Sequence, residues 1–227
     1  MNKIVSKEHF SANVVKLEVE APLIARSRKA GHFVIVKVGD KGERIPLTIA
    51  GADTEKGTIT LVIQAVGGSS RKICELNEGD YITDVVGPLG QATHIEKVGT
   101  VVCAGGGVGV APLLPIVEAF HKAGNRVIVV LAARTKDLVI LEEQMRQNSD
   151  EVIIMTDDGS YERLGDEWCG ERDQPGEGGF MRYDRSGHYD EIRFRSYKEI
   201  RDSYRSFLEY DHGGRNGYVW CLPDHGR

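Results

Sequence analysis

The chain has 227 residues, 28% of them charged, with a formal net charge of −5 and an isoelectric point near 5.8. This balance excludes the overall basic field that draws proteins to nucleic acid or anionic membranes, so neither is expected as a partner. The N-terminus lacks an apolar signal core, and no apolar run reaches the roughly 18 residues of a membrane span, which predicts a cytoplasmic protein. The four cysteines form no C-x-x-C pair, so reduced thiols are expected.

The first hundred residues predict a small antiparallel β-barrel, which we place at residues 1–97. The runs NVVKLEVEAP and GHFVIVKVG mix β-branched and polar residues and end at proline or glycine, as strands do. GTITLVIQAV alternates, with Ile59, Leu61 and Ile63 on one face. GDYITDVVGPLG predicts a further strand that ends in a Gly-Pro turn. Short strands at this spacing are typical of a barrel.

Two stretches of this barrel contain residues that folding alone does not require. In RIPLTIAG, Arg44 precedes a proline that fixes the local backbone, and Thr48 offers a hydroxyl. In VGGSSRKICEL, two glycines and two serines lead into a short amphipathic helix, whose first N–H groups suit a phosphate. Each stretch also has a purely structural interpretation. The first would be an edge strand with a solvated arginine, and the second a serine N-cap on a surface helix.

Residues 98–164 predict a partial α/β lobe with the order strand–helix–strand–helix–strand. KVGTVVCAGG, RVIVVLAAR and EVIIMTDDG are apolar runs of the kind found in buried parallel strands. LLPIVEAFHKAG predicts the first helix, with Gly124 at its C-terminal end, and KDLVILEEQMRQNS predicts the second. Alternation at this spacing indicates a parallel sheet with right-handed crossovers.

Ligands of such sheets bind beyond the carboxyl ends of the strands. The three predicted strand ends carry a glycine loop at residues 105–109, Arg134, and the pair Asp157–Asp158. The loop lets backbone approach a pyrophosphate, although it lacks the third glycine of a full G-x-G-x-x-G pattern. A tight strand–helix turn and a helix cap are the structural alternatives for the loop and for the acidic pair.

The order of these motifs resembles the ferredoxin–NADP reductase superfamily. GERIPLTIA, GPLG, CAGGGVGVAP, AARTKDL and TDDGSY resemble the flavin subunit of NADH-dependent ferredoxin:NADP oxidoreductase, formerly called sulfide dehydrogenase. The electron-transfer subunit of dihydroorotate dehydrogenase is a near relative. The resemblance covers roughly residues 1–164 and implies an FAD-binding barrel followed by an NAD(P)-binding lobe.

The resemblance also implies roles for individual positions. Arg44 would meet the FAD pyrophosphate, and Thr48 would reach the N5 edge of the isoalloxazine as the residue nearest to the chemistry. Pro46 and Leu47 would flank the isoalloxazine. The other implied flavin contacts are Gln64, Ala65, Val66, Gly67, Ser69 and Ser70. The implied nicotinamide-nucleotide contacts are Gly105, Gly106, Gly107, Val108, Gly109, Pro112, Arg134 and Asp157.

Residues 165–227 change in composition. Leu, Ile and Val number 49 in residues 1–165 but five in the 62 residues that follow, and those 62 residues hold 11 of the 16 aromatic residues. A segment so poor in aliphatic residues supplies no core. We therefore expect a mostly irregular tail, with a parallel sheet that stops after residues 151–156 and at most a short helix near 197–209.

The tail is interpreted as a frameshifted translation. Back-translation and a shift by one nucleotide allow P-A-I-M-M-K-F from SGHYDEIRF and D-G-T-G-M-C-G-A-C-R from the C-terminal segment. Both resemble strings that the family carries there. The slip would lie near residues 163–165, and the alternative is an unrelated natural extension. Cys169 and Cys221 are isolated, so the family's [2Fe–2S] cluster and any other metal are expected to be absent.

The sequence thus predicts a flavin oxidoreductase subunit that passes electrons between NAD(P)H, FAD and an iron–sulfur partner such as ferredoxin. A catalytic iron–sulfur or flavin subunit is the expected partner. Two alternatives stay open: a non-catalytic nucleotide- or partner-binding remnant, and an electron-transfer subunit of dihydroorotate dehydrogenase in pyrimidine synthesis. The choice between NADH and NADPH also stays open, because Arg134 favours a 2′-phosphate and Asp157 repels one.

Overall fold

The computed structural model describes residues 1–164, 178–183, 189–194 and 219–224, with side chains for residues 1–162. The chain divides into two compact units, residues 1–94 with 114–116, and residues 95–113 with 117–227. No helix in the described part is long and apolar enough to cross a membrane. Our boundaries at 97/98 and 164/165 stay predictions.

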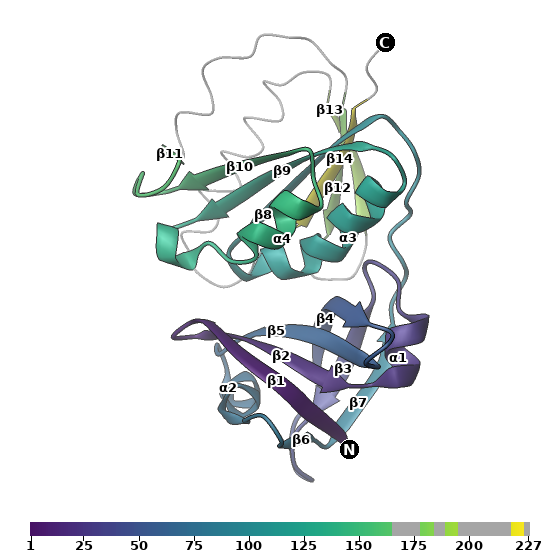
Figure 1. Cartoon of the computed structure of the whole chain (residues 1–227), viewed down its shortest axis with the longest axis vertical. Coiled ribbons are helices and arrows are strands. Elements are labelled where there is room, and N and C mark those ends of the chain that lie inside the picture. Colours follow the sequence, from purple (N-terminus) through teal and green to yellow (C-terminus); the bar gives the residue numbers. More distant parts are fainter. Residues whose placement is uncertain (165–177, 184–188, 195–218, 225–227) are drawn as a thin grey trace. The chain divides into compact units, whose positions relative to one another are not determined.

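The first unit is a nearly closed antiparallel barrel of seven strands, which confirms the predicted barrel. Its order is β6-β1-β2-β5-β4-β3-β7 (Figure 1). The strands are β1 (Asn2–Ser11), β2 (Val14–Glu20), β3 (Phe33–Lys37), β4 (Ile45–Asp53), β5 (Thr58–Gln64), β6 (Tyr81–Ile82) and β7 (Asp84–Leu89). The two end strands, β6 and β7, are separated in the chain by Thr83 alone, which brings the open edges of the sheet together.

The barrel core follows from the two-residue period of its strands. Leu17 of β2 stands opposite Leu61 of β5, and Ile49 of β4 stands opposite the same Leu61 in register. All three are at most 1% exposed, as are Ile59 and Ile63 on either side of Leu61. Alternate side chains therefore point inward and fill the barrel.

The structure excludes one structural alternative for the barrel and shows one prediction to be wrong. The stretch RIPLTIAG forms β4, which lies between β5 and β3, so it is an interior strand and not an edge strand. GDYITDVVGPLG forms two short strands, β6 and β7, which pair with opposite ends of the sheet. Pattern alone does not show this, because only the closing barrel separates the partners of the two strands. The barrel also carries two short helices, α1 (Pro22–Ser27) and α2 (Gly68–Glu75).

The second unit contains the predicted parallel sheet. Strands β8 (Thr100–Gly106), β9 (Arg126–Ala133) and β10 (Glu151–Thr156) pair in parallel, and the two-residue β11 (Arg163–Leu164) extends them. The connections contain η1 (Gly107–Gly109), α3 (Val110–Lys122), η2 (Lys136–Leu138) and α4 (Glu142–Gln147). Helices α3 and α4 lie on the same face of this sheet (Figure 1).

The second predicted helix is shorter than expected. KDLVILEEQMRQNS begins with the 3-10 turn η2, and α4 starts only at Glu142. Leu141, the residue before α4, has a φ of 58°, which interrupts any continuous helix. Ile140 and Leu141 are at most 8% exposed. Burial of this apolar pair takes precedence over the local helical pattern.

The tail also differs from the expectation. The backbone of residues 178–183, 189–194 and 219–224 forms strands β12 (Gly178–Tyr183), β13 (Tyr189–Phe194) and β14 (Val219–Asp224). β14 pairs antiparallel with β8, and β12 and β13 continue the sheet beyond it. Backbone pairing at the open edge of β8 needs no aliphatic side chains, which is why composition alone missed it. The helix expected near 197–209 lies outside the described residues.

Candidate functional site

Arg44 stands directly before β4, and Pro46, Leu47 and Thr48 lie within that strand. Leu47 and Thr48 are half-buried and face Val34 and Phe33 of β3 in register. The Arg44 side chain is 59% exposed, and its Nη2 donates to Asp84 Oδ2 at 3.0 Å. The guanidinium is thus anchored by one carboxylate while other donors stay available, since arginine carries five.

The second predicted flavin motif forms the turn from β5 into α2. Gln64 ends β5, and Val66 is 60% exposed in the connection. The Ser70 hydroxyl accepts hydrogen bonds from the N–H groups of Val66 and Gly67 at 3.1 and 2.9 Å, and it donates to the Gly67 carbonyl at 3.1 Å. Ser70 therefore fixes the turn from within α2, whose N-cap is Gly67 and not a serine. Ala65 lies in the same connection.

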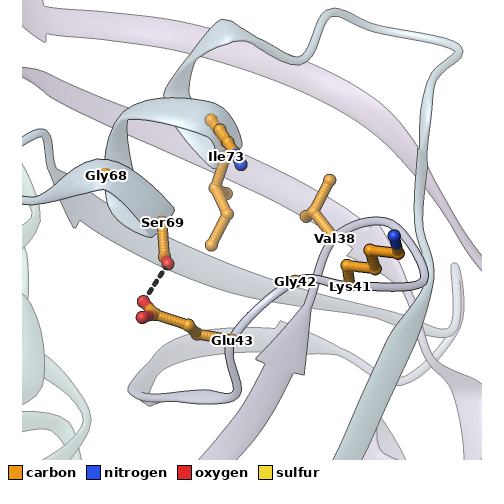
Figure 2. A pocket seen from close by; sticks show the side chains of 8 residues that line it. Val38, Lys41, Gly42, Glu43, Gly68, Ser69 and Ile73 are labelled. Carbon is orange, nitrogen blue, oxygen red and sulfur yellow. Dashed lines mark hydrogen bonds between the residues drawn. The ribbon is translucent and has the colours of Figure 1, made fainter.

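A cavity of about 250 Å³ connects the start of α2 with the loop before β4 (Figure 2). Ser69 points into this cavity from α2, and its Oγ donates to Glu43 Oε2 at 2.5 Å. Glu43 is the residue immediately before Arg44. The fold thus brings the loop that leads into R-I-P-L-T next to the G-G-S-S stretch, about 25 positions further along the chain.

The sequence did not predict several of the residues that line this cavity. Lys41 and Lys72 line the cavity with Glu43, and Val38 and Ile73 supply apolar wall. The sequence did contain a signal for Lys41 and Glu43, because both shortly precede Arg44 in the charged run DKGER. Lys72 is one turn into α2, and only the helical spacing would have placed it on the side of Ser69.

In the second unit, the predicted nucleotide loop ends β8. Gly105 and Gly106 are its last residues, Gly107 to Gly109 form η1, and Pro112 lies in the first turn of α3. Gly107 has a φ of 53°, and a Cβ there would meet nothing within 4 Å. A Cβ on Gly105 would lie 3.0 Å from Leu113 Cδ2. Gly105 therefore serves the packing of α3, while Gly107 leaves open space beside the backbone.

Arg134 and Asp157 follow β9 and β10 directly, so both lie at the carboxyl end of the sheet together with Gly106. The two loops are bonded to each other, since Asp157 N–H donates to the Ala133 carbonyl at 3.1 Å and Asp158 N–H donates to the Arg134 carbonyl at 3.3 Å. Arg134 and Asp157 are both exposed. The structure thus gathers three of the predicted nucleotide contacts at one edge.

A polar network braces this edge. Tyr161 donates to Glu142 Oε1 at 3.1 Å, and Arg146 also donates to that oxygen at 2.8 Å. The hydrogen bond to Glu142 raises the pKa of Tyr161. Lys136 Nζ lies 4.7 Å from the centroid of the Tyr161 ring. Hydrogen bonds from Ser160 lower the pKa of Asp158, which keeps that carboxylate charged beside Asp157.

The remaining titratable groups indicate structural roles. Burial, reinforced by Lys29 and Arg28, lowers the pKa of His32, and its Nδ1 accepts the Lys29 N–H at 3.1 Å. Within the described part of the chain, no group of three His, Cys, Asp or Glu side chains is placed to hold a metal ion. The Cys169 and Cys221 side chains lie outside the described residues.

Comparison with known proteins identifies relatives of the chain. No protein-family model matches it. It is 45% identical over 172 residues to an uncharacterized protein from the adh 3′ region of Clostridium beijerinckii. It is 42% identical over 160 residues to a homologue of the electron-transfer subunit of dihydroorotate dehydrogenase B (NAD⁺) from Thermotoga maritima. Over about 160 residues, the chain is therefore similar to electron-transfer subunits of this kind.

A solved structure of a ferredoxin–NADP oxidoreductase is also similar to this chain. The structure of an NADH-dependent reduced ferredoxin–NADP oxidoreductase, reported for flavin-based electron bifurcation, matches with a TM-score of 0.71 and 37% identity. The match covers 76% of this chain and 64% of the chain in that structure. The match to the Clostridium protein covers 73% of this chain and 58% of that protein. The match to the Thermotoga protein covers 70% of this chain and 56% of that protein. The chain therefore spans less than two thirds of these relatives.

Proposed function

We propose that the chain is a flavoprotein electron-transfer subunit. It binds FAD in the barrel unit and passes electrons between NAD(P)H and an iron–sulfur partner such as ferredoxin. The observation that carries this proposal is a cavity that Ser69, at the start of α2, lines together with Lys41 and Glu43 of the loop that leads into Arg44. The similarity to flavin subunits of the ferredoxin–NADP reductase type supports it.

The residues of the cavity fit the phosphate end of a dinucleotide. Lys41 and Lys72 supply positive charge, and Ser69 supplies a hydroxyl at the start of a helix, where backbone N–H groups are free of helical partners. A Cβ on Gly68 would meet nothing within 4 Å, so the glycine leaves room for a ligand beside the backbone. Arg44, adjacent to the cavity, would bind the pyrophosphate through the donors that Asp84 leaves open.

The remaining roles concern orientation. FAD, when bound, supplies two-electron exchange with a nicotinamide and one-electron exchange with an acceptor. Pro46 and Leu47 would flank the isoalloxazine, and the Thr48 hydroxyl would hydrogen-bond at its N5 edge. Gln64, Ala65 and Val66 would line the ring, and the exposure of Val66 leaves its apolar surface available for such a contact. The glycine loop, Pro112, Arg134 and Asp157 would bind the nicotinamide nucleotide.

A second candidate is a nucleotide- or partner-binding protein without turnover. It is favoured by the altered composition of residues 165–227. A third, narrower possibility within the first proposal is that the partner is a dihydroorotate-oxidising subunit. The proposal requires a partner in either case, so the lone chain should not reduce a physiological acceptor at full rate.

Absorbance spectra of the purified chain separate the first two candidates. We expect a bound-flavin spectrum that bleaches when NADH or NADPH is added without oxygen. The Arg44→Ala variant serves as the control for flavin bound at this site. Bound flavin that neither dinucleotide bleaches would support the non-catalytic candidate, and a chain that takes up no FAD would contradict the proposal.

A further inference from the structure

Glu43 occupies the place in the cavity where a phosphate is expected. Its Oε2 accepts the Ser69 Oγ–H at 2.5 Å, and Ser69 is the second residue of α2 (Figure 2). The start of a helix favours a negative charge, and the lysines at 41 and 72 line the same cavity. The carboxylate thus accepts the Ser69 hydrogen bond that the proposed function assigns to a phosphate.

Ser69 cannot serve both groups. A serine hydroxyl carries one proton, so it donates to one acceptor at a time, and here that acceptor is Glu43. Arg44 is different, because its bond to Asp84 uses one of five N–H donors. A phosphate can therefore join the Arg44–Asp84 pair, but it competes with Glu43 for Ser69.

The two negative charges also repel each other. A carboxylate about 5 Å from a phosphate in a water-exposed setting costs roughly 0.8 kcal/mol per charge pair, which corresponds to roughly a fourfold change in affinity. Glu43 is exposed, so its carboxylate is free to move away from the cavity at little structural cost.

We propose that Glu43 is an internal competitor of the flavin phosphate, which holds Ser69 when the cavity is empty and must leave it when FAD binds. This rests on the proposed flavin function. Glu43 then sets the affinity of the site. Its carboxylate accepts the Ser69 hydrogen bond when the cavity is empty, and it lowers the affinity of the cavity for a phosphate.

The test is a titration of the flavin-free protein with FAD, followed by flavin fluorescence. Glu43→Gln keeps the size and a hydrogen-bond acceptor but removes the charge. We expect it to bind FAD roughly three- to tenfold more tightly than the parent at low salt, with a smaller gain at high salt. The gain should shrink in a Ser69→Ala background, because the carboxylate is then no longer held at the cavity. Glu75→Gln, which loses the same charge at the other end of α2, is the matched control and should bind like the parent.

Parallel titrations with ADP and inorganic pyrophosphate keep the test independent of the flavin proposal. Unchanged or weaker FAD binding by Glu43→Gln, with the parent binding FAD, would overturn the competitor role alone; weaker binding would instead make Glu43 a flavin ligand. A parent that binds no FAD would refute the proposed function. The ADP and pyrophosphate affinities of the variants would then still decide whether Glu43 competes with phosphate.

Discussion

At the scale of single residues, two of the predicted phosphate contacts in the barrel have a carboxylate partner. Arg44 is paired with Asp84, and Ser69 is paired with Glu43. Arg44 and Glu43 are exposed and their partners are half-buried, so neither pair contributes much to folding. Their replacement should therefore change ligand binding more than stability.

Arg44→Ala should weaken FAD binding about ten- to a hundredfold, because a charge-assisted hydrogen bond is worth about 1.5–3 kcal/mol. The melting temperature of the flavin-free protein should barely change, since the lost ion pair with Asp84 is exposed. FAD retained after dialysis measures the first effect and thermal unfolding the second. Arg26→Ala, an exposed arginine in α1, is the control, and equal retention in both variants would contradict the placement of the pyrophosphate.

Gly68→Ala also separates ligand binding from folding, because it should weaken FAD binding without lowering stability. The added methyl group meets no protein atom within 4 Å, and alanine is the better helix former, so stability should stay equal or rise. FAD binding should fall, because the methyl group enters the cavity. A titration with FAD and a thermal melt of each variant check both parts, with Arg71→Ala on the same helix as the control. Undiminished FAD binding would place the phosphate elsewhere.

At the scale of elements, one buried side chain joins α3 to the approach to β8. Asn125 is 4% exposed, and its Oδ1 accepts the N–H groups of Val98 and Gly99 at 2.7 and 3.1 Å. Its Nδ2 donates to the carbonyls of Glu96 and Phe120 at 2.9 and 3.0 Å. The residue therefore fixes where the first parallel strand starts relative to the end of the first helix.

Asn125→Ala should lower the free energy of unfolding by about 3 kcal/mol, because the N–H groups of Val98 and Gly99 lose their acceptor and buried unsatisfied groups cost about 1–3 kcal/mol each. Urea denaturation measures the change. Asn148→Ala is the matched control, because its Nδ2 makes a single hydrogen bond, to the Gln144 carbonyl, and it should cost less than about 1 kcal/mol. A small loss in Asn125→Ala would mean that water replaces the amide.

At the scale of the whole molecule, residues 165–227 contain none of the predicted cofactor contacts. All of those contacts lie at or before Asp157, and the described tail strands attach at β8, where β14 pairs from Thr100 to Gly105. The relatives match over 160 and 172 residues, which agrees with a resemblance that ends near residue 164. A frameshift and an unrelated natural extension both predict this, so the frameshift interpretation stays a prediction. Sequencing the codons for residues 163–165 tests that interpretation directly.

A chain that ends at Leu164 should bind FAD as the full chain does, within about twofold, since the barrel has its own core. It should also aggregate more readily, because removal of β14 exposes the paired edge of β8. FAD titration and light scattering measure the two effects against the full chain. Loss of FAD binding would show that the tail contributes to the flavin site.

The sequence by itself determined the elements whose signal is local. The alternation of Ile59, Leu61 and Ile63 predicted a strand with one buried face, and the glycine loop with its apolar flanks predicted the turn from β8 toward α3. The motifs also indicated the family, because their order along the chain is itself sequence information.

Only the tertiary structure decided what depends on distant partners. Closure of the barrel made β4 an interior strand, burial of Ile140 and Leu141 shortened the second helix, and the open edge of β8 took up β14. It also brought Glu43 to Ser69, a contact between residues 26 positions apart. The physical reason is the same throughout: local patterns fix how a segment folds, but hydrogen-bond partners and burial across the chain exist only once the fold has formed.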